Sequence, residues 1–196
     1  MRNKTTRVTI IMILVAVAVV GYYSYLSGRA RAQKKETEMS TMQTVLSRSM
    51  TQDYPPTPKE VIKYYNEILK CFYNEECTEE EIEALGNKAR ELYDRDLLAN
   101  NEEEVYLLNL KADIQEYKDN KRRLTSASVA SSANVFFFSQ DGYDFARIMC
   151  GYTIMEGRTS IPSGQVYLLR RDEDKHWKIY GWESAAEYNE KMEAAQ

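Results

Sequence analysis

The side chains best suited to nucleophilic, acid–base or metal chemistry are few in this sequence and lie far apart. The chain of 196 residues has one histidine, His176, and three cysteines, Cys71, Cys77 and Cys150. No set of these residues with carboxylates has metal-ligand spacing, and the Gly-x-Ser-x-Gly, P-loop and Gly-x-Gly-x-x-Gly motifs do not occur. His176 follows Lys175 at the start of a predicted strand, where a surface position explains it. The sequence therefore predicts no catalytic residue, no metal and no cofactor.

Cys71 and Cys77 are the two cysteines placed to form a disulfide. Cys71 falls at the end of a predicted helix and Cys77 in the loop that follows, so a turn can bring their Cα atoms within the ~7 Å that the bond requires. An oxidising location would permit this bond. The alternative leaves both thiols free. Cys150 lies among alternating apolar residues, and we expect a buried, reduced thiol there.

Acidic residues are concentrated in two short tracts, residues 79–83 and 102–104. Neither has the alternating Asp-x-Asp-x-Asp-Gly spacing that wraps a calcium ion. Both fall in the first turn of a predicted helix, where negative charge complements the helix dipole. These tracts are therefore interpreted as helix starts.

Charge is distributed unevenly along the chain. Residues 1–48 carry a net charge of +6, whereas residues 49–196 carry −10. An acidic domain repels phosphate backbones, and the two basic clusters, residues 121–123 and 170–171, are interpreted as solvated turn charges. No nucleic-acid partner is expected.

The run from Val8 to Leu26 contains no charged residue. As a helix it would span about 28 Å, close to the thickness of a bilayer hydrocarbon core. A cleaved signal peptide is the alternative, but its Ala-x-Ala pattern, residues 30–32, lies well beyond the apolar run. The sequence predicts a cytoplasmic tail at 1–7, a transmembrane helix at 8–26 and a domain facing outside, in a single-pass protein of the cell membrane.

Residues 27–53 are predicted to be a polar linker. Apolar side chains recur within it at helical spacing, which indicates a short amphipathic helix. We expect this helix to pack against the domain; contact with a membrane or a partner is the alternative. The apolar residues are Met39, Met42, Val45, Leu46 and Met50.

Three helices open the domain, which is assigned to residues 54–183. Thr57 is a predicted N-cap for a helix over 58–73, with Pro58 at its first position. Thr78 begins a capping box for a second helix that continues toward residue 93. A third helix is predicted from residue 102 to about residue 121.

The residues after 124 change to serine, β-branched and aromatic types, which favour strands. Four strands are predicted, at 125–139 with a bend at 131–134, at 143–155, at 165–171 and at 176–182. In the last strand, Trp177 and Ile179 are predicted in the core, and Trp182, a third marker of the fold, on the opposite face. Ser184 is a predicted cap for a short helix in the tail, 184–196.

These elements predict an α+β fold. Three N-terminal helices pack on a curved, cone-like sheet of four antiparallel strands, and a transmembrane helix precedes them.

The order of three helices and then strands, closed by the hairpin VYLLRRDEDKHWKIYGWE at 166–183, resembles the cone-shaped fold of nuclear transport factor 2 and ketosteroid isomerase. The resemblance covers residues 54–183. More narrowly, residues 53–68, 89–101 and 177–182 are similar to an uncharacterised family of membrane-anchored proteins from Gram-positive anaerobes. The resemblance implies an architecture and an outward location. It implies no activity, because that family has none assigned.

Isomerase-like members of the cone fold place an acidic base and a tyrosine in the cone. In this chain Asp94, Asp96 and Asp113 are the acidic candidates, beside many tyrosines. With 30 acidic residues and 15 tyrosines such candidates arise by composition alone. The fold also hosts many non-enzymes.

We therefore expect a membrane-tethered, non-enzymatic module that binds an unknown protein partner or a small apolar ligand. A binder of a small hydrophobic ligand is the first alternative, and an isomerase-like or hydratase-like enzyme is the second. A deep apolar pocket would favour a ligand, whereas a plugged cone beside an exposed apolar sheet would favour a protein partner.

Overall fold

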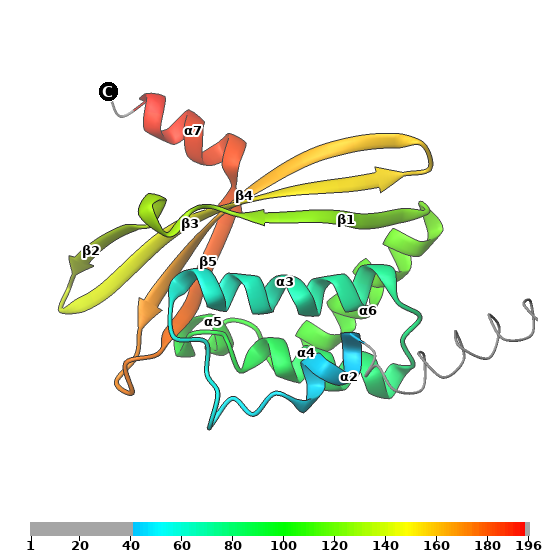
Figure 1. Ribbon diagram of the computed structural model, residues 1–196, viewed down its shortest axis with the longest axis horizontal. Helices are drawn as coiled ribbons and strands as arrows, with labels where there is room; N and C mark the ends of the chain where they lie inside the picture. Colours follow the sequence, from blue (N-terminus) through cyan, green and yellow to red (C-terminus); the bar gives the residue numbers. More distant parts are fainter. Residues whose placement is uncertain (1–40, 195–196) are drawn as a thin grey trace, which may run out of the picture. The chain divides into compact units, whose positions relative to one another are not determined.

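A single antiparallel sheet carries the helix α3 along one face and the last helix, α7, on the other (Figure 1). The computed structural model describes residues 41–194, and these belong to one compact unit that begins at Thr41. The helices are α2 (Thr41–Ser47), α3 (Pro58–Asn74), α4 (Glu79–Arg90), α5 (Arg95–Ala99), α6 (Glu103–Asp119) and α7 (Ala185–Ala194). The strands are β1 (Arg122–Val129), β2 (Phe136–Gln140), β3 (Tyr143–Glu156), β4 (Thr159–Arg171) and β5 (Trp177–Ser184), with a 3-10 turn, η1 (Ser132–Asn134), between β1 and β2.

Helix α3 is the central helix of the core. Thr57 has an extended backbone and its hydroxyl accepts a hydrogen bond from the Glu60 amide, while Pro58 occupies the first helical position. One apolar stripe of the helix is fully buried, with Val61 and Ile68 both at 0% exposure. This stripe packs against β1, β3 and β5.

The other helices begin at side-chain caps or at turns. Thr78 and Glu81 form a reciprocal capping box at the start of α4. The carboxylate of Asp94 caps α5, a short helix that the sequence did not predict, by accepting from the Asp96 amide. Ser184 accepts from the Glu187 amide at the start of α7.

The sheet has the order β1-β3-β4-β5, and β2 also pairs with β3. Beyond β5, the segment 92–94 runs beside the strand as a short parallel bridge between Tyr93 and Ile179. Two hydrogen bonds hold it: the Ile179 amide donates to the Leu92 carbonyl and the Asp94 amide donates to the Ile179 carbonyl, each at 2.8 Å. The linker between α4 and α5 therefore pairs with the outer edge of β5 at Ile179.

The prediction of four strands is wrong, because the sheet has five. The stretch expected to be one bent strand at 125–139 is broken by η1, where the Ser131 hydroxyl accepts from the Ala133 amide. Strands β1 and β2 pair with β3 one after the other along its length. The hydrogen bond to the Ser131 side chain thus replaces the backbone pairing of the sheet and separates β1 from β2.

The predicted transmembrane helix also requires correction. Within residues 41–194, no helix has both the length and the apolar character needed to cross a bilayer. The expected span at 8–26 lies outside the described residues, so the fold as described is an α+β domain of six α-helices and five strands without such a helix.

Part of the predicted linker belongs to the domain. Within it α2 forms, and Met42, Val45 and Met50 lie in the hydrophobic core. The Tyr64 hydroxyl donates to the Val45 carbonyl at 2.7 Å, which fixes α2 to α3. The compact unit therefore starts before the assigned boundary at Tyr54.

The faces of β5 change along the strand. Trp177 and Ile179 are buried, at 9% and 0% exposure, whereas Trp182 is 42% exposed. Between Leu168 and Leu169 the register shifts, so that Ile179 pairs with Leu169 but Trp182 pairs with Tyr167. This bulge places Trp182 on the same inner face as Ile179, not on the opposite face as predicted.

Candidate functional site

A cavity of about 410 Å³ lies inside the domain between α3, α6 and the inner face of the sheet. Nine of its nineteen lining residues are aromatic: seven tyrosines, Phe72 and Trp182. The tyrosines are Tyr65, Tyr73, Tyr93, Tyr106, Tyr117, Tyr152 and Tyr167. A small aromatic cavity of this size is within the range of ligand sites in proteins.

Two helices build one side of the cavity through their spacing. On α6, Tyr106, Leu110, Asp113 and Tyr117 recur at intervals of four, three and four residues, so they share one helix face. On α3 the residues that line the cavity, Tyr65 among them, follow the same rule. The helical period alone therefore aims these side chains inward.

The sheet builds the other side. Tyr152 on β3, Tyr167 on β4 and Trp182 on β5 all project from its inner face. The Trp182 ring centroid lies 6.2 Å from that of Tyr167 and 6.3 Å from that of Tyr65. Trp182 thus combines ring contact on its buried side with an exposed surface that faces the cavity.

The phenol hydroxyls in the cavity wall bond mainly to one another. The Tyr65 and Tyr93 oxygens are 3.1 Å apart, and those of Tyr152 and Tyr167 are 2.7 Å apart. Tyr152 also donates to the Asn66 side-chain oxygen at 2.8 Å. No buried side-chain nitrogen or oxygen among the described residues lacks a partner.

These phenols remain protonated over the ordinary pH range. Burial is the main cause and raises the pKa of Tyr65 and Tyr167 well above 10. Burial likewise raises the pKa of Tyr93 and Tyr152. The wall is therefore neutral, with hydroxyl groups that donate and accept hydrogen bonds.

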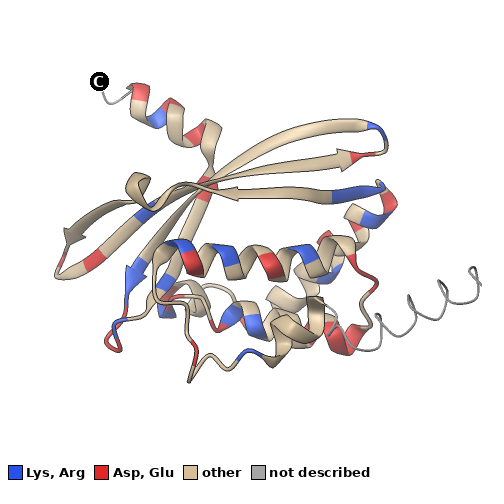
Figure 2. Cartoon of the chain, in the orientation of Figure 1, with Lys and Arg blue, Asp and Glu red and all other residues tan. Residues whose placement is uncertain are grey.

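Asp113 is the one charged side chain among the described residues that line the cavity. Elsewhere, charged residues lie on helix surfaces and near strand ends, and most of the sheet is uncharged (Figure 2). The pKa of Tyr73 is raised by burial, then by Tyr117, then by the negative charge of Asp113. The carboxylate therefore acts electrostatically on the cavity wall.

Asp94 and Asp96, the other acidic candidates, lie outside this cavity. Both bind Arg170, which is 7% exposed. Its guanidinium donates to both oxygens of Asp94 and lies 4.8 Å from the ring centroids of Tyr143 and Tyr180. The two carboxylates thus hold the α5 start to β4. Asp94 and Arg170 also line a second, charged cavity of about 400 Å³.

Comparison with family models places the chain in a family. The model described as a domain of unknown function (DUF6715) matches residues 1–182. The chain belongs to this family. No curated protein sequence matches the chain. The family match covers α2 to α6 and nearly all of the sheet, so the whole aromatic cavity is part of the family domain.

The three cysteines of this family member are free thiols. Cys71 is fully buried at the end of α3, and the half-buried Cys77 donates to its carbonyl oxygen at 3.4 Å. Burial raises the pKa of Cys71 to about 12. The possible Cys71–Cys77 disulfide stays a prediction. Cys150 is buried at 1% exposure, and its sulfur accepts from Asn66 at 3.3 Å.

One group of possible metal ligands lies at the turn between β4 and β5, which the sequence did not point to. Single ligand atoms of Asp172, Asp174 and His176 lie within 4.8 Å of one another. Asp172 also accepts from the His176 amide, and the His176 ring stacks on Tyr54 at 4.2 Å. These contacts are those of a closed hairpin turn, and exposed acidic groups commonly occur in turns.

Proposed function

We propose that this chain is a non-enzymatic module that binds a small, largely apolar molecule in the aromatic cavity. The observation that carries the proposal is the cavity of about 410 Å³, which is lined by tyrosine, phenylalanine and tryptophan rings among other residues. Rings of this kind supply large contact area at low conformational cost, and the paired phenols supply polar anchors.

Catalysis is less well supported. A general base must reach the reacting proton, and its neighbours normally shift its pKa toward the working pH. Asp94 and Asp96 are bound to Arg170, away from the aromatic cavity. Asp113 is exposed on α6, and no histidine or cysteine lines the cavity among the described residues. We propose binding and not turnover for these reasons.

The resemblance to the cone fold of nuclear transport factor 2 belongs to this proposal. It is supported by the placement of α3 and α6 against the inner face of a curved antiparallel sheet, with the cavity between them (Figure 1). The fold alone does not decide the function, because the same fold carries enzymes and non-enzymes.

The test is binding of a neutral fluorescent probe, N-phenyl-1-naphthylamine, to the full chain. Ser163 lines the cavity on β4, and Ser163→Trp should fill it. Ser160 lies on the same strand beside Met155 and outside the lining, so Ser160→Trp is the matched control. We expect Ser163→Trp to weaken probe binding about tenfold or more, which is the effect of losing a few contacting groups in an apolar site.

Equal binding by both variants would show that the probe binds elsewhere in the chain. No binding by the unsubstituted chain would equally count against the proposal. Both variants must retain the far-ultraviolet circular dichroism of the parent, since a misfolded variant would lose binding for another reason.

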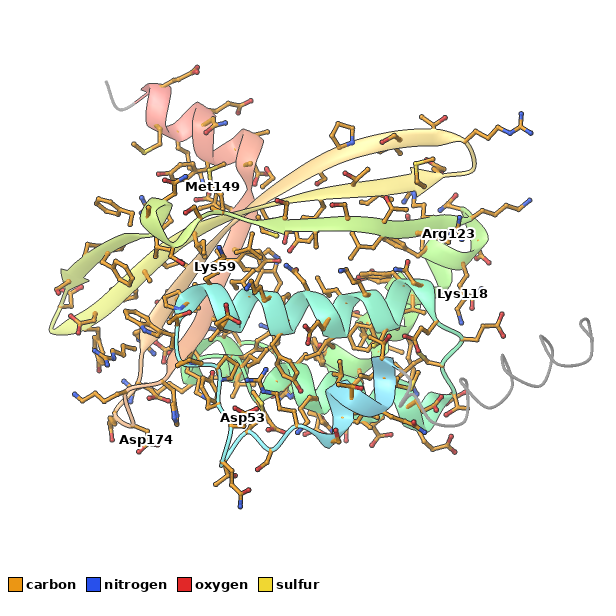
Figure 3. The ribbon with its side chains drawn as sticks, viewed as in Figure 1. Asp53, Lys59, Lys118, Arg123, Met149 and Asp174 are labelled. Atoms are coloured by element: carbon orange, nitrogen blue, oxygen red, sulfur yellow. The ribbon has the colours of Figure 1, made fainter. Side chains whose placement is uncertain are left out.

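A second candidate function, docking of a protein partner, is favoured by the outer face of the sheet. Phe136, Met149 and Tyr180 are 60%, 45% and 37% exposed there. Figure 3 shows Met149 on the face away from α3. Exposed apolar side chains gathered on one face are typical of interaction surfaces. Loss of partner capture in Met149→Asp and Phe136→Asp, but not in Ser160→Asp, would support it.

A further inference from the structure

The charge pattern around the aromatic cavity indicates which ligand it prefers. The residues that line it include one carboxylate, Asp113, and no lysine, arginine or histidine from the described part of the chain. The one charge that an anionic ligand would meet among these lining residues is therefore negative. Residues 49–196 carry a net charge of −10, which also raises the local concentration of cations.

Aromatic faces add a second attraction for cations. The π-electron face of tryptophan, and less strongly that of tyrosine, attracts a cation within about 6 Å of the ring centroid. Trp182 lines the cavity, and 42% of its surface is exposed. Tyr106 and Tyr117 already contact guanidinium groups, Arg90 at 5.5 Å and Arg122 at 6.0 Å. The inference therefore relies on Trp182 and Asp113.

The composition of the lining favours one kind of cation. A primary ammonium group carries three protons and needs oxygen acceptors for each when it is buried. The lining has nine aromatic residues, and five residues with carboxylate, amide or serine oxygens: Asn101, Asn109, Asp113, Ser163 and Gln165. An alkylated ammonium group has fewer or no protons to satisfy, so it uses the more abundant ring faces better than a primary ammonium group does.

We propose that the ligand of the aromatic cavity is an organic cation, with an alkylated ammonium head on an apolar body. This inference rests on the proposed binding function. In this proposal the ring of Trp182 attracts the head group, Asp113 is the one counter-charge in the lining, and the apolar body fills the rest of the cavity.

Three probes of nearly the same shape and different charge test the inference. They are phenyltrimethylammonium (+1), tert-butylbenzene (0) and benzenesulfonate (−1), measured by equilibrium dialysis against the full chain at low salt. We expect the cation to bind about tenfold more tightly than its neutral isostere, and the anion to bind most weakly. High salt should reduce the cation preference, because Asp113 is exposed.

Variants locate the effect in the cavity. Asp113→Asn should weaken binding of the cation about threefold to tenfold and leave the neutral probe unchanged. Glu104→Gln makes the same charge change on α6 at an exposed position outside the lining, and it should change neither. Trp182→Leu keeps an apolar side chain but removes the ring, so it should weaken the cation more than the neutral probe.

The other possible outcomes would refute the cation inference, the assignment to this cavity or the proposed function. Equal or tighter binding of the neutral or anionic probe overturns the cation inference and leaves the proposed function standing. If neither Asp113→Asn nor Trp182→Leu changes the affinity for the cation, the assignment of the binding site to this cavity is wrong. If none of the three probes binds while N-phenyl-1-naphthylamine does, the cation inference alone fails. If nothing binds, the proposed function fails as well.

Discussion

The buried tyrosines predict that this domain unfolds cooperatively in alkali. Four phenols in the cavity wall are at most 8% exposed: Tyr65, Tyr93, Tyr152 and Tyr167. Burial raises the pKa of each in the folded chain. In the unfolded chain each should titrate near pH ~10. The folded chain therefore holds more protons above that pH, so stability is complete below it and falls as pH rises.

The size of this effect follows from the number of phenols. At pH 11 a tyrosine that ionises only when unfolded removes about 1.4 kcal/mol from the free energy of unfolding. Four such residues remove about 6 kcal/mol, which is comparable to the total stability of an ordinary domain, about 5–15 kcal/mol. We therefore expect unfolding at about pH 11 even without denaturant.

The assay follows two signals during a titration from pH 8 to pH 12. Circular dichroism reports the fold, and absorbance at 295 nm reports tyrosinate. The absorbance of the four cavity phenols should appear only as the dichroism is lost. Replacing Tyr152 by phenylalanine should reduce the pH dependence of stability by about 1.4 kcal/mol per pH unit above pH 10. Tyr180→Phe, which removes an exposed phenol, is the control.

Complete ionisation of the phenols while the dichroism stays intact would refute the reasoning. It would mean that water reaches the cavity wall in the folded protein. The phenols of the wall would then not be kept protonated by burial, as the description of the cavity requires.

Three further predictions concern the core, the ion pair and the cysteines. Trp177→Ala should reduce the free energy of unfolding by about 3–5 kcal/mol, and Trp182→Ala by less than about 2 kcal/mol, since only Trp177 is buried. Equal losses in urea denaturation would contradict this difference in burial. Asp94→Asn should reduce the free energy of unfolding by about 3–5 kcal/mol, because Arg170 stays buried without this carboxylate. Asp96→Asn should cost less, because Asp96 is half-exposed. A loss under about 1 kcal/mol for Asp94→Asn would mean that Arg170 finds another partner. In the reduced native chain, Cys77 should react with iodoacetamide before Cys71 and Cys150, which are buried; labelling of Cys77 that appears only after reduction would instead show the Cys71–Cys77 disulfide.

Helices α3 and α4 were predictable because each carries two independent signals. For α3 and α4, a capping threonine marks the start and an apolar stripe of period 3.6 marks the buried face. The short α5 has no room for such a stripe. It forms because Asp94 is fixed by Arg170, a residue far away in the sequence. Local patterns cannot report that contact.

The cavity wall was missed for a different reason. A strand read with strict alternation places Trp182 opposite Ile179, because their positions differ by an odd number. One unpaired residue at the bulge reverses this relation and turns Trp182 inward. Nothing in the local sequence shows the bulge, since it depends on how β5 pairs with β4. Asp113 was among the acidic candidates, but fifteen tyrosines gave no way to choose those that line the cavity.

The bridge between Tyr93 and Ile179 has a consequence for how the chain folds during synthesis. Residues 92–94 leave the ribosome before every strand of the sheet, and β5 is the last strand to follow. Contacts that join distant parts of a chain form slowly. When β5 pairs with β4, the same two hydrogen bonds occupy the amide and the carbonyl of Ile179 on its outer edge. An open strand edge invites pairing with other chains, so the last strand to be synthesised is also one whose edge is protected, at Ile179, by a segment that was synthesised earlier.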